Sequence, residues 1–316
     1  MRALLLALTV LAGLMPLSAN AADKLTVLLD WFVNPDHGPL IVAAEKGYFA
    51  DNGLDVELVP PADPSAPPRL VAAGQADIAI SYQPNLYLQV AEDLPLTRIA
   101  TLVETPLNTL VVLEDGPIET IADLKGKTVG FSVGGFEDAL LGMMLEQVGL
   151  SLDDVDLVNV NFSLSPSLYA GKVDAVIGAF RNFELNQMQI DGRPGRAFYP
   201  EENGVPVYDE LILLARNDML YNAEKADVLG RLVAAVEAAT IWMTNHPEEA
   251  WEVFIAAHPD LDNELNERAW FDTMPRFAKR PAALDTGRYE RFGDFMKERG
   301  LIDETVPVTD YAVELR

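Results

Sequence analysis

Two stretches about a hundred residues apart, "APPRLVAAGQADIAIS" (66–81) and "SPSLYAGKVDAVIGA" (165–179), show the same features in the same order. Each begins with an apolar helical segment, turns at a glycine placed three residues before an aspartate, and continues as an apolar strand. The matching landmarks are Gly74 with Asp77 and Gly171 with Asp174. A repeat of this kind predicts two structural units built on one plan.

The repeat extends upstream of both stretches. Each unit begins with an apolar strand, continues with a helix that ends at a glycine, and returns to a strand, the segments being 25–31, 39–53 and 54–60 in the first unit and 127–133, 134–149 and 155–162 in the second. The order is therefore strand, helix, strand, helix, strand with short connections. This order predicts an α/β fold in which a parallel sheet is flanked by helices.

Two further strands are expected to join the units. "NTLVVLEDGPI" (108–118) leads into the second unit and "DELILLARND" (209–218) leads back. Two crossings form a hinge that lets two lobes close on a ligand. We expect residues 22–109 and 210–316 to form the first lobe, completed by the helical segment 222–316, and residues 110–209 to form the second, each lobe having a mixed, mainly parallel sheet.

The composition indicates an exported, soluble protein. Residues 1–21 combine one early arginine, an apolar run and a small-residue cleavage site, which is typical of a signal peptide. Without cysteine the chain has neither disulfides nor a lipid-anchored cysteine, so we expect a free periplasmic protein with no membrane insertion after cleavage. The formal net charge of −26 repels nucleic acid and anionic membranes.

Five loops are expected to line one cleft. Right-handed crossovers place the loops that follow parallel strands at one edge of a sheet, where ligands bind in open α/β sheets. These loops are 30–38, 81–85, 131–136, 161–165 and 178–184. Aromatic residues gather in them: we expect Trp31, Tyr82 and Phe180 to face a ligand, and Phe131, Phe162 and Phe183 to face the core.

The chemistry of these loops favours binding over catalysis. Asp30, Asp36 and His37 could supply three metal ligands, but His246 and His258 stand before prolines at expected helix ends, so no metal site is predicted. The chain has no cysteine, no G-x-S-x-G turn and no phosphate-binding glycine motif around Gly134 and Gly135.

Three carboxylates in these loops bear on the ligand. Glu184 could accept hydrogen bonds from the amino edge of a flat ring or donate one if protonated; the alternative is a solvated glutamate in the first turn of a helix. Glu137 and Asp138 occupy the positive end of an expected helix, which disfavours sulfonate, nitrate or phosphate as ligands.

Three segments carry a resemblance: "LDWFVNPDHGPLIVAAEKGYFADNGLDVEL" (29–58), "GFSVGGFEDALL" (130–141) and "DAVIGAFRNFE" (174–184). They closely resemble the thiamine-precursor branch of periplasmic binding proteins, the ABC-transporter receptors for formylaminopyrimidine or hydroxymethylpyrimidine. Sulfonate and nitrate receptors share parts of these segments but not the W-x-x-N-x-x-H loop of Trp31, Asn34 and His37. The similarity covers nearly the whole chain after residue 21.

The resemblance implies a type II periplasmic binding fold with a pyrimidine in the cleft and without a cofactor or metal. The expected partners are an inner-membrane ABC permease and its ATPase. The positions that match the family's ligand-binding residues are Trp31, Asn34, His37, Tyr82, Ser132, Gly134, Gly135, Phe136, Phe180 and Glu184.

Two alternatives remain open. Synthases of the thiamine pyrimidine resemble this chain in fold and consume a histidine of their own, a role that would fall to His37. They also carry a cysteine-rich iron-binding motif, which this chain lacks, and an exported protein is separated from pyridoxal phosphate. The other alternative is a receptor for another small solute, such as a sulfonate or a riboflavin-like ring.

Overall fold

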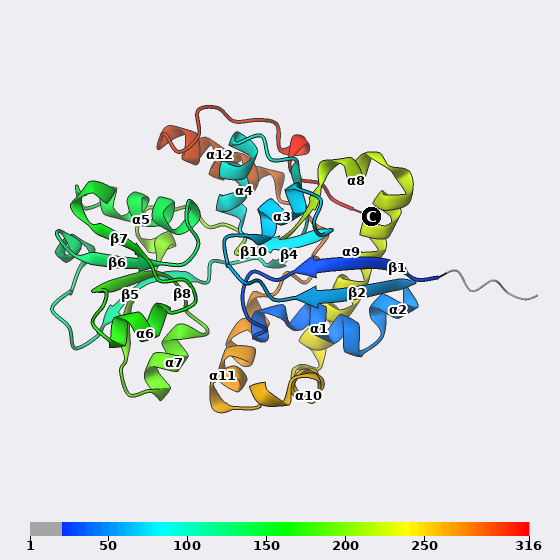
Figure 1. Ribbon diagram of the computed structural model, residues 1–316, viewed down its shortest axis with the longest axis horizontal. Coiled ribbons are helices and arrows are strands. Elements are labelled where there is room, and N and C mark those ends of the chain that lie inside the picture. The colour runs from blue at the N-terminus through cyan, green and yellow to red at the C-terminus, as the bar shows by residue number, and fades with distance from the viewer. Residues whose placement is uncertain (1–20, 316) are drawn as a thin grey trace, which may run out of the picture.

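The computed structural model describes residues 21–315, which form two lobes side by side (Figure 1). The expected signal peptide, 1–21, lies outside the described residues except for Ala21. Among the described residues, no helix is long and apolar enough to cross a membrane.

The first lobe is built on a five-stranded sheet of order β2-β1-β3-β10-β4. β1, β2 and β3 run parallel, and β10 is antiparallel to both of its neighbours. The bounds are β1 (Asp23–Leu28), β2 (Leu54–Val59), β3 (Ile78–Ser81), β4 (Leu96–Val103) and β10 (Leu211–Arg216). All residues of the central strand β3 are buried, as expected for a strand covered on both faces, and all residues of the edge strand β4 are buried as well.

The second lobe repeats this plan with a sheet of order β7-β6-β8-β5-β9. β6, β7 and β8 are parallel, and β5 is antiparallel to β8 and β9. The bounds are β5 (Asn108–Leu113), β6 (Thr128–Phe131), β7 (Asp156–Asn159), β8 (Ala175–Phe180) and β9 (Gly195–Phe198). The α/β fold with two mixed sheets is therefore confirmed.

The repeated glycine and aspartate, Gly74 with Asp77 and Gly171 with Asp174, occupy equivalent positions in the two lobes and make equivalent contacts. Gly74 and Gly171 end their helices with φ values of 72° and 64°, a conformation that favours glycine. Three residues later, Asp77 Oδ2 accepts the backbone N–H of Thr26 at 2.8 Å, and Asp174 Oδ2 accepts that of Thr128 at 2.9 Å. These carboxylates tie the last parallel strand of each unit to the first.

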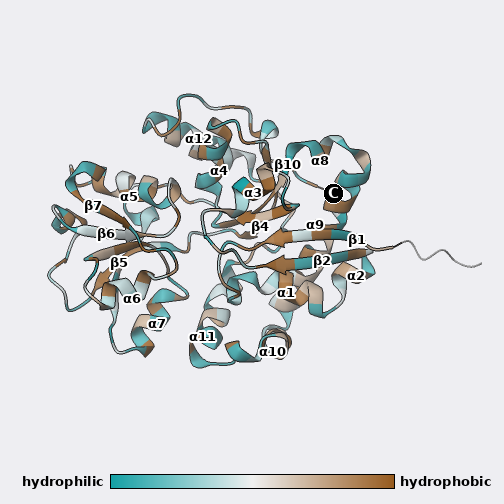
Figure 2. Cartoon of the chain, viewed as in Figure 1, coloured by the Kyte–Doolittle hydropathy of each residue, from teal (hydrophilic) through white to brown (hydrophobic). Residues whose placement is uncertain are grey.

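Helices flank both sheets, and in Figure 2 the strands are largely hydrophobic whereas the helices mix hydrophobic and hydrophilic residues. In the second lobe they are α5 (Phe136–Glu146), α6 (Leu164–Tyr169) and α7 (Glu184–Ile190). In the first lobe they are α1 (Gly38–Glu45), α2 (Tyr48–Asp51), α3 (Pro67–Ala72), α4 (Gln83–Ala91), α8 (Asn217–Tyr221), α9 (Ala223–Asn245), α10 (Pro247–Ala257), α11 (Glu264–Thr273) and α12 (Thr286–Glu298). The helix expected over 39–53 is broken at Gly47, where φ is 79°.

The chain crosses between the lobes twice, from β4 to β5 and from β9 to β10. The crossings comprise residues 104–107 and 199–210, so the boundary expected at 209/210 lies in the second crossing, whereas the boundary expected at 109/110 lies inside β5. The buried carboxylate of Glu210, on the returning crossing, accepts the backbone N–H groups of Leu107 and Asn108 at 2.5 and 2.9 Å. The two hinge segments are therefore bonded directly to each other.

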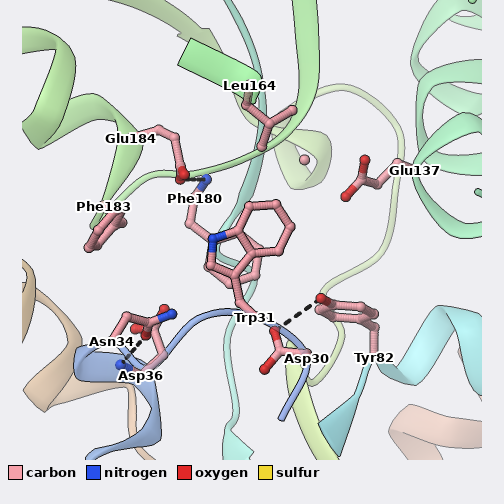
Figure 3. A pocket seen from close by; sticks show the side chains of 11 residues that line it. Asp30, Trp31, Asn34, Asp36, Tyr82, Glu137, Leu164, Phe180, Phe183 and Glu184 are labelled. Carbon is pink, nitrogen blue, oxygen red and sulfur yellow. Dashed lines mark hydrogen bonds between the residues drawn. The ribbon is translucent and has the colours of Figure 1, made fainter. Parts of the chain in front are cut away.

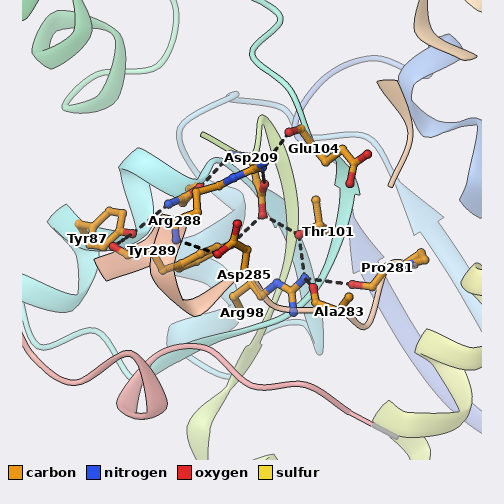
Figure 4. A network of polar contacts seen from close by, with 11 residues as sticks. Tyr87, Arg98, Thr101, Glu104, Asp209, Pro281, Ala283, Asp285, Arg288 and Tyr289 are labelled. Carbon is orange, nitrogen blue, oxygen red and sulfur yellow. Dashed lines mark hydrogen bonds and ion pairs between the residues drawn. The ribbon is translucent and has the colours of Figure 1, made fainter. Parts of the chain in front are cut away.

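The residue before Glu210 anchors the returning crossing in the first lobe (Figure 4). Asp209 accepts the hydroxyl groups of Thr101 at 2.9 Å and Tyr289 at 3.2 Å, and it forms an ion pair with Arg288. Below it, the fully buried Arg98 donates to Thr101 and to the backbone carbonyls of Pro281, Ala282, Ala283 and Val313. The hinge therefore starts from a rigid base.

Candidate functional site

A cavity lies between the lobes (Figure 3). Both lobes contribute to its wall. The lining residues are Asp30, Trp31, Asn34, Asp36, Tyr82, Glu137, Leu164, Gly178, Phe180, Phe183 and Glu184. All of them except Glu137 fall in the five loops predicted from the repeat, and Glu137 follows the third loop directly.

Aromatic rings form much of the wall. In Figure 3 the indole of Trp31 lies in the middle of the view in front of Phe180, with Phe183 on one side and Tyr82 on the other. Trp31 also meets Phe162 of the second lobe edge to face, with ring centroids 4.7 Å apart. These faces can hold a flat ring by stacking and burial.

Four carboxyl groups face the same cavity, those of Asp30, Asp36, Glu137 and Glu184, and none of the lining residues is Lys, Arg or His. Burial is the main cause that raises the pKa of Asp36 to about 6, of Glu184 to about 7 and of Glu137 to about 8. Near neutral pH these groups include protonated acids that can donate as well as accept hydrogen bonds. The cavity therefore suits a ring that carries both donors and acceptors, and it opposes anions.

Glu184 is the first residue of α7, and its carboxyl group is positioned by a hydrogen bond at the start of that helix. Its Oε2 accepts the backbone N–H of Phe180 at 2.7 Å, which closes the loop between β8 and α7. That hydrogen bond lowers the pKa of Glu184, but burial outweighs it. In contrast to the alternative of a solvated surface glutamate, the side chain is buried and faces the cavity.

Asp30 links the first two loops of the cavity. Its Oδ2 accepts the hydroxyl group of Tyr82 at 3.0 Å, and its Oδ1 lies 2.9 Å from Nε2 of His37. The other ring nitrogen of His37 accepts the backbone N–H of Asn34 at 3.3 Å, which leaves Nε2 to donate to Asp30. The fully buried His37 thus orients Asp30 from behind and does not line the cavity.

Five of the ten predicted site residues line the cavity, namely Trp31, Asn34, Tyr82, Phe180 and Glu184. The other five, His37, Ser132, Gly134, Gly135 and Phe136, lie outside its wall. Phe136 is fully buried and stacks on Tyr82 with centroids 4.6 Å apart, so it positions the tyrosine ring. Ser132 donates its backbone N–H to Glu137 at 2.6 Å.

Sequence reasoning did not select six lining residues, Asp30, Asp36, Glu137, Leu164, Gly178 and Phe183. Phe183 was expected to face the core, but it faces the cavity because the chain turns between β8 and α7. Asp30 and Asp36 line the cavity and also accept hydrogen bonds from neighbouring side chains. Nothing in the residue pattern indicates which side of a loop a side chain takes.

Contacts across the cleft show that the lobes are closed. Asn182, which follows β8, donates to Asp36 Oδ1 at 2.6 Å and to Thr273 Oγ1 of α11 at 2.6 Å. Nearby, Asn186 of α7 donates to Asp272 at 2.7 Å. These bonds join the second lobe to the first beside the ligand cavity.

The described residues contain no group of three or more His, Cys, Asp or Glu side chains arranged to hold a metal ion. His246 and His258 lie at the ends of α9 and α10, as their position before prolines indicated.

The family model described as NMT1/THI5 like matches residues 34–250. The chain belongs to the NMT1/THI5-like family. A protein of Haemophilus influenzae named putative thiamine biosynthesis protein is 50% identical over 307 residues, which cover 97% of this chain and 96% of the relative. The formylaminopyrimidine-binding protein of Halalkalibacterium halodurans is 37% identical, with coverage of 83% of this chain and 80% of the relative.

Other relatives and solved structures are more distant. Proteins named 4-amino-5-hydroxymethyl-2-methylpyrimidine phosphate synthase, from Legionella pneumophila and Saccharomyces cerevisiae, are 24% and 27% identical. The alkanesulfonate-binding protein of Xanthomonas axonopodis pv. citri, solved with bound MOPS, has a TM-score of 0.72 at 15% identity and covers 93% of this chain and 99% of its own. This likeness confirms the periplasmic-binding-protein fold.

Proposed function

We propose that this chain is the periplasmic solute-binding receptor of an ABC importer, and that it captures a thiamine pyrimidine precursor in the cleft between its lobes. The ligand is formylaminopyrimidine or hydroxymethylpyrimidine. The closed form is then presented to an inner-membrane permease with its ATPase.

The observation that carries the proposal is the combination of aromatic walls with buried carboxyl groups in one closed cavity. An aminopyrimidine has a flat face for stacking and an edge with both a donor and acceptors. Trp31 and Phe180 would face the ring, while Glu184 and Asn34 would bind its amino group and ring nitrogen. The relative named formylaminopyrimidine-binding protein supports the same ligand class.

Isothermal titration calorimetry of the purified, refolded protein tests this proposal. We expect saturable heat from formylaminopyrimidine or hydroxymethylpyrimidine and none from an alkylsulfonate. Thiamine, which carries the same pyrimidine on a bulky cationic ring, measures how far the cavity tolerates a substituent. Heat from the alkylsulfonate alone would refute the proposal.

The second candidate is a pyrimidine synthase, which the more distant relatives favour. Against it stands the position of His37, which is fully buried with both ring nitrogens hydrogen bonded and lies outside the cavity wall. Incubation with pyridoxal phosphate and iron, followed by mass spectrometry of the intact chain, distinguishes the two. A receptor keeps its mass, whereas a synthase loses mass from the consumed histidine.

A further inference from the structure

Glu137 lines the cavity, but the proposed contacts to the pyrimidine give it no role. It lies in the first turn of α5, directly after the β6–α5 loop, and its side chain is buried. In Figure 3 its carboxyl group points from the α5 side toward the middle of the cavity. Its Oε2 accepts the backbone N–H of Ser132 at 2.6 Å, and a second backbone hydrogen bond comes from Val133.

The backbone N–H groups of Ser132 and Val133 form a site, called the seat below, that can bind a negatively charged or neutral oxygen. A loop that leads into the N-terminus of an eleven-residue helix presents its donors, together with the helix dipole, to whatever acceptor lies there. The N-cap residue Gly135 makes no side-chain cap hydrogen bond. In this protein the acceptor is the carboxyl group of Glu137 itself.

The facing strand β8 leaves room for that carboxyl group because it has a glycine at this point. Gly178 of β8 has a φ of 103°, and a Cβ at this position would collide with both oxygens of Glu137. A side chain at 178 would therefore displace the carboxyl group from its seat. A buried donor and a glycine on the opposite strand are two independent features that accommodate Glu137 in one place.

We propose that Glu137 is a specificity-determining residue: its carboxyl group occupies the backbone donors at the β6–α5 loop and thereby restricts the cavity to ligands without an anionic substituent. The inference rests on the proposed function and deepens it, since it assigns the ligand to the unphosphorylated class. A phosphate monoester of the pyrimidine would need these donors for its oxygens. The carboxyl group of Glu137 already occupies these donors, and the cavity is lined by three further carboxyl groups and by no cationic side chain.

Calorimetry with two probes tests the inference: 4-amino-5-hydroxymethyl-2-methylpyrimidine and its phosphate monoester. The measured quantity is the ratio of the two Kd values. We expect the wild type to bind the alcohol at least a hundredfold more tightly than the ester. Glu137→Ala and Glu137→Ser, whose side chains cannot reach the Ser132 N–H, should reduce that ratio at least tenfold by gaining affinity for the ester.

Two further variants separate occupancy of the seat from charge. Glu137→Gln keeps an acceptor oxygen on the Ser132 N–H, so it should still exclude the ester, with weaker binding of the alcohol. Asp138→Asn removes a neighbouring charge from the same helix end, outside the cavity wall, and should leave the ratio unchanged. A ratio that falls equally in Glu137→Gln, or in Asp138→Asn, would overturn the occupancy argument in favour of simple charge repulsion.

The outcomes distinguish this inference from the proposed function. A wild type that binds the ester as tightly as the alcohol refutes the inference and leaves the proposed function intact, even if the Ala and Ser variants fail to fold. If the wild type binds neither probe and no formylaminopyrimidine, the proposed function fails. In that case inorganic phosphate tests the inference. Phosphate should raise the melting temperature of Glu137→Ala and leave that of the wild type unchanged. The same shift, or no shift, in both proteins would overturn the inference.

Discussion

At the scale of single residues, the cavity depends on carboxyl groups kept in an apolar setting. Glu184 is buried among aromatic residues, and burial raises its pKa to about 7. A ligand amino group that donates to this carboxyl would favour its ionised form and so gain a hydrogen bond to a charged acceptor. Ligand affinity should therefore respond strongly to this one side chain.

We expect Glu184→Gln to weaken pyrimidine binding by about 1.5–3 kcal/mol, the usual size of a hydrogen bond to a charged group. The measurement is calorimetric titration at neutral pH. Glu202→Gln, an exposed charge-matched change in the same lobe, is the control and should bind as the wild type does. Equal affinities of the Glu184→Gln variant and the control would show that Glu184 does not touch the ligand.

Trp31→Ala should weaken binding by at least as much, because it removes a stacking face and buried area from the cavity. Trp31 also contacts Phe162 across the cleft, so Phe162→Ala serves as the comparison that removes only the contact between the lobes. Trp242→Ala, which removes a half-buried indole of α9 beneath Lys46, controls for the loss of an indole elsewhere. Should Phe162→Ala cost as much as Trp31→Ala, the indole acts in closure and not in stacking.

At the scale of elements, the repeat made the site's location predictable. Two copies of strand, helix, strand, helix, strand placed five loops at one cleft, and ten of the eleven lining residues come from those loops. The orientation of side chains within a loop was not predictable. His37 ends a short 3₁₀ turn that points its ring behind Asp30, and such a turn leaves no periodic pattern in the sequence.

The loop after β8 also closes the lobes. Asn182→Ala removes two hydrogen bonds to Asp36 and Thr273 without removing a lining residue. Because these bonds form only when the lobes meet, we expect affinity to fall by about 1–3 kcal/mol. Titration calorimetry measures the loss, and small-angle X-ray scattering should show a more open average shape.

Asn186→Ala is the comparison for this prediction, since it removes an interlobe bond that is exposed to solvent, together with a bond to the backbone carbonyl of Asn182. Its effect should be smaller, as expected for a bond that competes with water. If both variants bind like the wild type, the contacts of Asn182 do not stabilise the closed form.

At the scale of the whole molecule, buried carboxyl groups link stability to pH. The pKa values of Asp36, Glu184, Glu210 and Glu137 are raised to about 6, 7, 7 and 8, each mainly by burial. A carboxyl group whose pKa is higher in the folded state stabilises the fold fully below its unfolded pKa and loses that contribution as pH rises through the folded pKa. The ligand-free protein should therefore become less stable between about pH 5 and pH 8.

Glu137→Gln isolates one part of this effect. Glu137 is surrounded by Glu210 and Asp138, which raise its pKa further, and no cation is among the causes of its shift. Relative to the glutamine variant, the wild type should lose up to about 1.4 kcal/mol of unfolding free energy for each pH unit in this window. Urea unfolding at several pH values measures the difference, with Glu202→Gln as the control. Parallel stability curves for the wild type and Glu137→Gln would contradict the raised pKa.

Two lobes built on one plan enclose a cavity lined by carboxyl groups, and we propose that this cavity binds an aminopyrimidine. A crystal structure of the protein with 4-amino-5-hydroxymethyl-2-methylpyrimidine tests it most directly. We predict the ring between the aromatic walls formed by Trp31 and Phe180, with its amino group within hydrogen-bond distance of Glu184. An empty cavity, or a pyrimidine bound outside the cleft, would contradict the account.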